Sequence, residues 1–197
     1  MVKLTKELVL ELNAFSNPNT KIARLLKENK LFKIKQGFYE NNKDVNPFYL
    51  TNIIYGPSYI SFQTALAYYG LIPERVYAIT SATFGKHKTK EYKNIFGTYL
   101  YMDIPKTAYP FGIEKIEENG YCYFIATKEK AICDMLYEYQ PVYSVKDIKK
   151  LLFEDLRIDE YMFFNLNIDL LKELSSLYKT TNHKFLIKYL ERIKNEK

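Results

Sequence analysis

The N-terminal part of the fold is decided by residues 17–39, which read NPNTKIARLLKENKLFKIKQGFY. Asn17 followed by Pro18 is typical of a helix start, because a capping side chain precedes a proline at the first helical position. Apolar side chains then recur at helical spacing, and two short strand-like segments flank the dipeptide Gln36-Gly37. The stretch therefore predicts a helix followed at once by a tight β-hairpin.

Positive charge is concentrated in this stretch. Between Asn17 and Gly37 there are six Lys or Arg residues and one acid, a net charge of +5, whereas the whole chain carries +6. The cations are Lys21, Arg24, Lys27, Lys30, Lys33 and Lys35. Such clustering is typical of a phosphate-binding surface. A basic helix followed by a basic hairpin is also the layout of a winged helix, in which the helix enters the major groove of DNA.

We predict that DNA is bound by the hairpin and by the side of the helix away from the apolar stripe of Ile22, Leu25 and Leu26. Arg24 can pair bidentately with a guanine edge, whereas lysines carry little sequence information. The alternative is a solvated helix face and a hairpin that only cap a domain. The predicted DNA-binding residues are Asn19, Thr20, Lys21, Arg24, Lys27, Lys33, Lys35 and Gln36.

The domain organisation follows from a change in composition. A chain of 197 residues suits one or two domains, and residues 41–47 are polar between two apolar patterns. We therefore predict a DNA-binding domain at 1–45 and a second domain at 49–197. No apolar run approaches a membrane span, and the N-terminus lacks the apolar core of a signal peptide. With two cysteines at no framework spacing, the sequence predicts a cytoplasmic protein with reduced thiols.

The signals along the chain predict an α+β fold with a mostly antiparallel sheet and a helical C-terminus. Helical spacing over 3–15 gives the N-terminal module two helices, which makes it a winged-helix-like module that lacks its first helix. In the second domain, strands or hairpins are predicted at 76–83, 95–104 and 113–126, the last around an Asn119-Gly120 turn. The predicted helix caps are Ser61, Thr127, Ser144 and Asn167. Asp134, beside an apolar stripe, is interpreted as a carboxylate satisfied by a helix end or a tyrosine hydroxyl.

Enzymatic chemistry finds little support in the sequence. The two histidines, His87 and His183, lie beside lysines, where we expect both to be exposed, and they share no metal-ligand spacing with the cysteines. There is no serine-nucleophile motif and no glycine-rich phosphate loop. We therefore predict no catalytic residue, no metal and no cofactor. A nuclease-like set of Asp103, Glu114 and Lys115 is the enzymatic alternative.

Three blocks of the sequence resemble, in the same order, those of the AbiEi-type antitoxins, a family of predicted transcriptional regulators of viral defence systems. The first block is KIARLLK at 21–27 with KIKQGFY at 33–39. The second is YISFQTAL at 59–66 with YGLIPE at 69–74, and the third is ATKEKAICD at 126–134. Three blocks in order are more specific than any one of them alone.

The resemblance implies a function for each domain. It implies that an N-terminal winged helix represses the antitoxin–toxin operon by binding double-stranded operator DNA, and that the C-terminal domain neutralises the effect of a nucleotidyltransferase-like toxin. Whether the antitoxin contacts the toxin directly stays open, as does the choice between one copy and a homodimer on the operator. The alternative function is a protein-interaction module that keeps antitoxin activity without operator binding.

Overall fold

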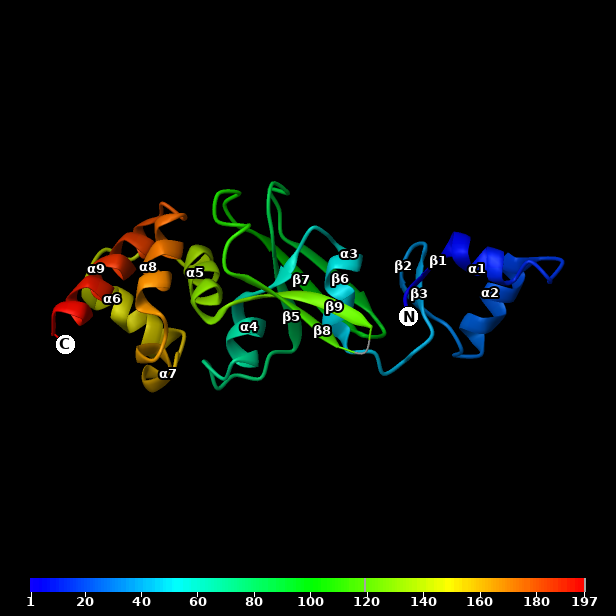
Figure 1. The fold of residues 1–197 in the computed structure, drawn as a ribbon, viewed down its shortest axis with the longest axis horizontal. Coiled ribbons are helices and arrows are strands. Elements are labelled where there is room, and N and C mark those ends of the chain that lie inside the picture. Colours follow the sequence, from blue (N-terminus) through cyan, green and yellow to red (C-terminus); the bar gives the residue numbers. More distant parts are fainter. Residues whose placement is uncertain (119, 197) are drawn as a thin grey trace.

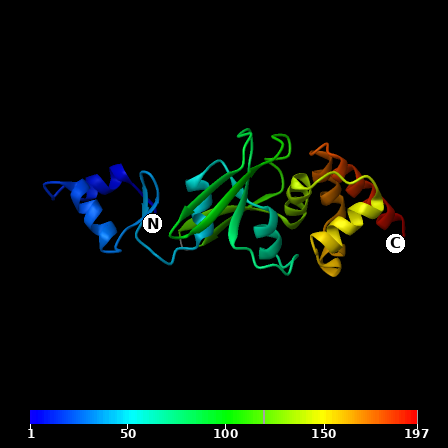
Figure 2. The ribbon, with the colours of Figure 1, turned by 180° about the vertical axis from the view of Figure 1, so that it is seen from behind.

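The structure is a computed structural model that describes residues 1–118 and 120–196. Its parts follow one another along the longest axis of the molecule (Figure 1, Figure 2). Two helices and a small sheet form one end, a larger sheet with helices lies in the middle, and a group of helices forms the other end. The predicted α+β class with a helical C-terminus is confirmed. Within the described residues, no helix is long and apolar enough to cross a membrane.

The described N-terminal end combines three short strands with two helices. In chain order these are β1 (Lys3–Leu4), α1 (Thr5–Glu11), α2 (Pro18–Lys27), β2 (Phe32–Lys35) and β3 (Phe38–Glu40). The strands pair antiparallel in the order β1-β3-β2. The helix predicted from Pro18 and the hairpin predicted around Gln36-Gly37 are therefore confirmed.

The helix predicted over 3–15 is shorter than expected. Lys3 and Leu4 form β1, which pairs with β3, and the helix runs only from Thr5 to Glu11. The backbone of Lys3 and Leu4 forms strand hydrogen bonds with β3 and so cannot be helical. Helical spacing of apolar residues does not reveal such a pairing with a distant segment. The hairpin of β2 and β3 is consequently part of a three-stranded sheet. The added strand is β1, which leads directly into α1.

A small apolar cluster holds the N-terminal helices on this sheet. Its buried members are Leu8, Ile22, Leu31 and Tyr39. Leu25 and Leu26 of the predicted helix stripe pack against this cluster. The apolar stripe therefore faces inward as predicted, and the opposite side of α2 is left to solvent.

The central sheet has six strands among the described residues. They are β4 (Tyr59–Ile60), β5 (Ala78–Thr83), β6 (Lys90–Asn94), β7 (Gly97–Asp103), β8 (Ile113–Glu118) and β9 (Tyr121–Ala126). Their order is β6-β7-β5-β4-β9-β8, with three antiparallel and two parallel pairings. The mostly antiparallel sheet and the hairpin at 113–126 are confirmed, whereas the sequence does not predict the parallel pairs β4–β9 and β5–β7. Asn119 of the predicted turn lies outside the described residues.

Helices flank this sheet and form the C-terminal end. They are η1 (Pro47–Leu50), α3 (Thr51–Ile54), α4 (Phe62–Tyr68), α5 (Lys128–Glu138), α6 (Val145–Lys150), η2 (Leu151–Asp155), α7 (Glu160–Phe164), α8 (Ile168–Ser176) and α9 (Thr181–Glu196). The predicted caps Thr127, Ser144 and Asn167 each accept a hydrogen bond from a first-turn backbone N–H. Ser61 precedes α4 as predicted, but its hydroxyl donates to Asp134 instead of capping the helix. In Figure 1, α4 and α5 lie between the sheet and the C-terminal helices.

The N-terminal module contacts the central sheet through its hairpin. Ile34 of β2 is buried in the main apolar core, and its carbonyl accepts a hydrogen bond from the Asn94 side chain at 3.1 Å. The rings of Phe32 and Phe96 meet edge to face with their centroids 6.2 Å apart. The polar segment after β3 contains no regular element before η1. The division into two domains stays a prediction, because the hairpin shares its packing with the second of them.

Candidate nucleic-acid interface

The basic helix α2 is held in place by its cap and by its apolar side. The Asn17 side chain accepts a hydrogen bond from the Thr20 backbone N–H at 3.1 Å, Pro18 occupies the first turn, and Ile22 is buried. The exposed positions of the helix are Asn19, Thr20, Ala23, Arg24 and Lys27. They recur at a spacing of one helical turn and so form one face, which contains no acid between Pro18 and Lys27 and is followed by the exposed Glu28 at the C-cap.

Arg24 is oriented by the acid at the end of the helix. Its Nε atom donates to Oε1 of Glu28 at 2.6 Å, and Lys30 donates to Oε2 of the same carboxylate at 3.0 Å. The hydrogen bonds from Arg24 and then from Lys30 lower the pKa of Glu28 to about 2. The Arg24 side chain nevertheless remains 70% exposed. To contact DNA, Arg24 must break or share its ion pair with Glu28. This pair is exposed to solvent, so breaking it costs little free energy.

The other two cations of the helix differ in their surroundings. Lys27 is exposed and has no hydrogen bond or ion pair to any residue that the structure describes. Lys21 is half-buried, and its Nζ atom lies 4.7 Å from the centroid of the Phe15 ring. Lys27 is thus free to contact a phosphate, whereas Lys21 lies at the edge of the exposed face.

The hairpin brings Lys33 and Gln36 together but directs Lys35 elsewhere. Lys33 is exposed, and its Nζ atom donates to Oε1 of Gln36 at 2.9 Å. Lys35 is half-buried, donates to the carbonyl of Ile54 at 3.2 Å, and lies 4.6 Å from the centroid of the Phe38 ring. The strand register shifts between Lys33 and Lys35, which lets the two side chains point differently. The predicted DNA contact of Lys35 requires its bond to Ile54 to break.

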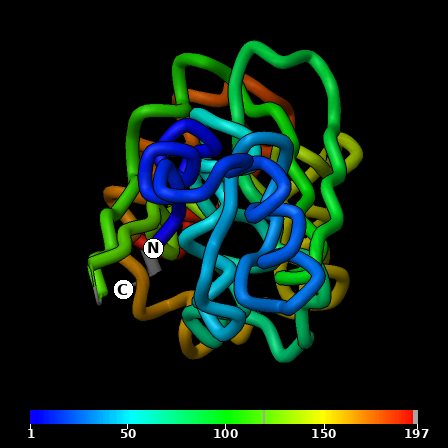
Figure 3. Tube along the Cα trace, turned by 90° about the vertical axis from the view of Figure 1, so that its right-hand side faces the viewer, coloured from blue at the N-terminus to red at the C-terminus, as the bar shows by residue number. Residues whose placement is uncertain are grey.

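The helix α2 lies at a free end of the molecule. Figure 3, viewed along the long axis from the N-terminal end, shows the N-terminal helices in front of the central sheet. No described element covers them from this side. A duplex can therefore approach this end without meeting the sheet or the C-terminal helices.

A second polar cluster is sealed inside the protein, where α5 meets β4 and the C-terminal helices. This α5 cluster consists of Tyr59, Ser61, Lys130, Asp134 and Tyr178. Lys130 and Asp134 have no exposed surface, and the Lys130 Nζ lies 3.3 Å from Oδ1 of Asp134. The hydroxyls of Tyr59 and Ser61 donate to Oδ2 of Asp134 at 2.8 and 2.6 Å, and Tyr178 donates to Oδ1. Lys130 also donates to the Tyr178 hydroxyl at 2.5 Å and to the Ala108 carbonyl at 2.7 Å.

These contacts make the α5 cluster structural. Burial, together with the charge of Asp134, raises the pKa of Tyr59 and of Tyr178, so both phenols stay neutral hydrogen-bond donors. Both oxygens of Asp134 are satisfied within the protein and sealed from any substrate. The interpretation of Asp134 as a carboxylate satisfied by tyrosine hydroxyls is confirmed. The sequence interpretation missed Lys130, although a Lys–Asp pair at i and i+4 beside an apolar stripe is a usable signal.

The expectation that His183 is exposed is wrong, whereas His87 is exposed as predicted. His183 is 1% exposed, and its ring stacks on Tyr178 with the centroids 4.2 Å apart. Its Nε2 atom donates to the Cys133 carbonyl at 2.9 Å, and its Nδ1 atom accepts from the Thr180 hydroxyl at 2.7 Å. Burial lowers the pKa of His183 to about 4, although the Cys133 carbonyl opposes this shift. The imidazole is therefore neutral at pH 7.

We expect this buried imidazole to make folding pH-dependent. The unfolded state takes up a proton near pH 6.5 and the folded state only near pH 4. The contribution of the neutral imidazole to the free energy of unfolding is therefore fully present above pH 6.5. It is lost as the pH falls toward 4, by about 3 kcal/mol in total. Urea unfolding of the wild-type protein and of His183→Gln, whose amide can still donate to the Cys133 carbonyl, measures this difference. The exposed-site control His87→Gln should keep the wild-type pH profile; identical profiles for His183→Gln and wild type would contradict the assignment.

The residues of the nuclease-like alternative are not assembled into a site. Asp103 of β7 accepts hydrogen bonds from the backbone N–H groups of Lys86 and His87, both at 2.6 Å. Glu114 lies on β8, which three strands separate from β7, and it accepts a hydrogen bond from Tyr69. In the described part of the chain, no group of three or more His, Cys, Asp or Glu side chains is placed to hold a metal ion.

Comparisons with known proteins assign no family to the chain. No protein-family model matches the sequence, and no curated protein matches it. The features that bear on function are therefore the exposed face of α2, the adjoining hairpin and the α5 cluster.

Proposed function

We propose that this protein is a DNA-binding antitoxin that represses its own operon. The observation that carries the DNA-binding half is the exposed face of α2, which presents Arg24 and Lys27 at a free end of the molecule, with Glu28 after the helix as the one acid paired to it. Lys33 and Gln36 of the hairpin supply a second point of contact. A helix with such a face suits the charge and the width of the DNA major groove.

The side chains of this face have distinct roles in the proposal. Asn19 and Thr20 lie in the first turn of α2, where their side chains can donate hydrogen bonds to a phosphate; the Thr20 backbone N–H is already bonded to the Asn17 cap. The small side chain of Ala23 lets the helix approach the base edges closely. Arg24 donates two hydrogen bonds to a guanine, and Lys27 contacts the phosphate backbone. Most of the affinity is then electrostatic, and most of the sequence preference comes from one residue.

Salt dependence tests the DNA-binding half. The full-length protein is expected to bind duplex DNA from upstream of its gene, and the three cations Arg24, Lys27 and Lys33 predict a slope of about −2.7 in log K against log salt concentration. Fluorescence anisotropy over about 50 to 200 mM salt measures this slope. Absence of binding at the lowest salt, or a flat dependence, would exclude DNA as the ligand of α2.

The antitoxin half rests on the resemblance to AbiEi-type antitoxins, and one structural observation supports it. The block at 59–66 contains Tyr59 and Ser61, and the block at 126–134 contains Lys130 and Asp134. These four side chains meet in the α5 cluster, although the blocks lie far apart along the chain. The contact gives a physical reason for the two blocks to occur together in one fold.

Co-expression tests the antitoxin half with the full chain. The partner is the toxin encoded by the neighbouring gene, which we propose to be nucleotidyltransferase-like. A variant with Arg24→Ala and Lys27→Ala is expected to lose operon repression and to keep rescue from the toxin, since both substitutions lie on the exposed face of α2. Loss of rescue by a folded and abundant variant would contradict this separation of roles.

A protein-interaction module without operator binding is the second candidate. The contacts that favour it are those that hold one side of the hairpin, namely the bond from Lys35 to Ile54 and the packing of Phe32 on Phe96. A hairpin held in this way has less freedom to follow a DNA groove. Rescue from the toxin together with no measurable binding to the upstream DNA would select this candidate.

A further inference from the structure

A cavity of about 630 Å³ opens at the C-terminal end of the fold, between the end of α8 and the start of α9. It is lined by Ser175 and Ser176 of α8, by the connection at Lys179 and Thr180, and by side chains of α9. A cavity of this size lies in the range of small-molecule sites. It shares no lining residue with α2, with the hairpin or with the α5 cluster, so it needs a function of its own.

The polar groups in the inner wall of this cavity are already satisfied. The imidazole of His183 donates to the Cys133 carbonyl and accepts from the Thr180 hydroxyl. The hydroxyl of Ser175 donates to the Leu171 carbonyl at 2.6 Å. The inner wall therefore offers a ligand apolar surface, and polar recognition is left to the side chains at the rim.

Among the described residues, every charged side chain that lines the cavity is a cation. These side chains are Lys179, Lys184 and Lys188. Lys179 and Lys184 are exposed and have no ion pair or hydrogen bond to any residue that the structure describes. Elsewhere on the two helices a lysine can be paired, as Lys172 is with Glu191 at 2.7 Å. The two unpaired cations favour a ligand with negative charge.

The two unpaired lysines adjoin the same turn of the chain. Lys179 directly precedes Thr180, whose carbonyl accepts a hydrogen bond from the Lys184 backbone N–H at 3.1 Å. A helical side chain leans toward the N-terminus of its helix, so Lys184 extends over Thr180 and Thr181. Thr181 also lines the cavity, and its hydroxyl has no hydrogen bond to a described residue. Two ammonium groups and one hydroxyl are thus available to a single anionic group at this rim.

The cavity continues along α9 as an aliphatic surface. Ile187 follows Lys184 by three positions and so lies on the same side of the helix. Lys188 adds mainly its stem, because its Nζ atom lies 5.0 Å from the centroid of the Phe185 ring, which does not line the cavity. An anionic end and an apolar end within one cavity suit an amphipathic ligand.

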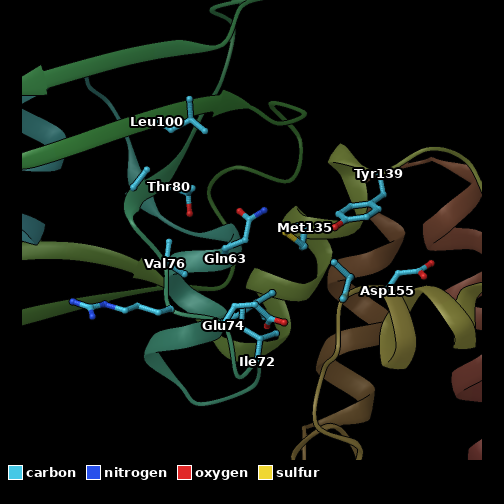
Figure 4. Close-up of a pocket in the computed structure, with 13 residues that line it drawn as sticks. Gln63, Ile72, Glu74, Val76, Thr80, Leu100, Met135, Tyr139 and Asp155 are labelled. Carbon is cyan, nitrogen blue, oxygen red and sulfur yellow. The ribbon is translucent and has the colours of Figure 1, made fainter.

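The cavity between the central sheet and the C-terminal helices lacks such an arrangement (Figure 4). Its volume is about 320 Å³, and acids and a cation both line it. Figure 4 shows Gln63 and the Asp155 carboxylate on opposite sides of it, with Met135 and Tyr139 between them. Its polar side chains do not converge on one group of a ligand.

We propose that the cavity between α8 and α9 binds an organic anion with a short hydrocarbon chain. Lys179, Lys184 and Thr181 hold the anionic group, and the chain packs on Ile187 and on the ring of His183. A carboxylate and a phosphate share this chemistry. The proposal does not depend on DNA binding or on antitoxin activity, because neither uses these residues.

Matched probes test the proposal on the full-length protein. Hexanoate and hexanamide have the same chain, but only the first is charged. Hexanoate is expected to bind with a dissociation constant on the order of 1 mM and to shift the amide NMR signals of Thr181, Lys184 and Ile187. Hexanamide should bind about fivefold more weakly, and butanoate, two methylenes shorter, about tenfold more weakly. Equal binding of hexanoate and either other probe, or shifts confined to other residues, would overturn the proposal.

Variants of the two lysines provide the second readout. Lys184→Gln and Lys179→Asn are each expected to weaken hexanoate binding about fivefold and to leave hexanamide binding unchanged. Asparagine suits position 179 because the backbone there has a φ of +54°, which asparagine adopts more readily than lysine. The matched control is Lys194→Gln, since Lys194 is an exposed lysine of the same helix that pairs with Asp169 and does not line the cavity. Unchanged affinity in both cavity variants, or an equal loss in the control, would overturn the proposal.

Hexyl phosphate distinguishes the two kinds of anionic group. It carries the same hydrocarbon chain as a phosphate ester. Binding more than about fivefold tighter than that of hexanoate indicates a phosphorylated ligand, whereas similar or weaker binding indicates a carboxylate. Absence of binding by both anions would overturn the proposal.

Discussion

A variant carrying Arg24→Ala and Lys27→Ala is expected to bind duplex DNA about 30- to 1,000-fold more weakly than the wild-type protein at physiological salt. The bidentate contact of an arginine with a guanine contributes about 1–3 kcal/mol, and a phosphate contact contributes about 1 kcal/mol more. Each 1.4 kcal/mol is about a tenfold change in affinity. Both side chains are exposed, so the loss should appear without a change in folding, and fluorescence anisotropy measures it directly.

A second double variant controls for the loss of net charge. Lys146→Ala with Lys149→Ala removes the same charge from the exposed surface of α6, at the opposite end of the molecule. This control should bind DNA within about twofold of the wild-type protein if contact at α2 matters more than overall charge. Equal losses in the two double variants would mean that binding is a non-specific effect of net charge.

Single substitutions separate base recognition from phosphate contacts. Arg24→Lys keeps the charge but loses the planar pair of donors, so it should relax base preference more than it lowers non-specific affinity. Lys33→Ala should weaken binding about equally on all sequences and reduce the salt slope by about one unit. Lys35→Ala should have a smaller effect, because Lys35 already donates to the Ile54 carbonyl. A larger effect from Lys35 than from Lys33 would show that the hairpin rearranges on DNA.

The second large effect is expected in the α5 cluster. Asp134→Leu should lower the free energy of unfolding by about 3–5 kcal/mol, because it leaves the fully buried ammonium of Lys130 without its carboxylate. It also removes the acceptor of three hydroxyls, those of Tyr59, Ser61 and Tyr178. Urea unfolding measures the loss, and Asp134→Asn serves as a milder variant of the same shape if the leucine variant does not fold.

The reciprocal variant and the double variant test whether the two charges act as a pair. Lys130→Met should cost about as much as Asp134→Leu, and the double variant should cost less than the sum, since it buries no uncompensated charge. The control is Lys172→Met, which breaks the exposed pair with Glu191 at 2.7 Å and should cost at most about 1 kcal/mol. Costs below about 1 kcal/mol for both cluster variants would show that the buried pair contributes little to stability.

The sequence by itself determined the elements whose signals are local. The start of α2 at Asn17 and Pro18, the turn at Gln36-Gly37 and the cap at Thr127 all depend on residues within a few positions of one another. The β8–β9 hairpin was predictable for the same reason. Each of these elements forms where the sequence places it, because its hydrogen bonds close within one short segment.

The candidate interface was predictable in part. Helical spacing places Lys21, Arg24 and Lys27 on one side of α2; the structure exposes Arg24 and Lys27, whereas Lys21 is half-buried beside the Phe15 ring. The direction of Lys35 was not predictable, because it depends on a register shift within the hairpin and on the packing of that hairpin against α3. Whether these residues contact DNA stays a prediction for the binding measurements above.

Only the tertiary structure decided which segments meet. The pairing of Lys3 and Leu4 with β3, the two parallel strand pairs of the central sheet and the burial of His183 all join segments far apart along the chain. Periodicity describes neighbours within one element and carries no information about pairs between elements. The sequence therefore determined where the charges and the helices lie, whereas the fold decided that Lys27 remains free at the surface and Lys130 is paired in the core. The physical reason is that burial and pairing depend on contacts between distant segments.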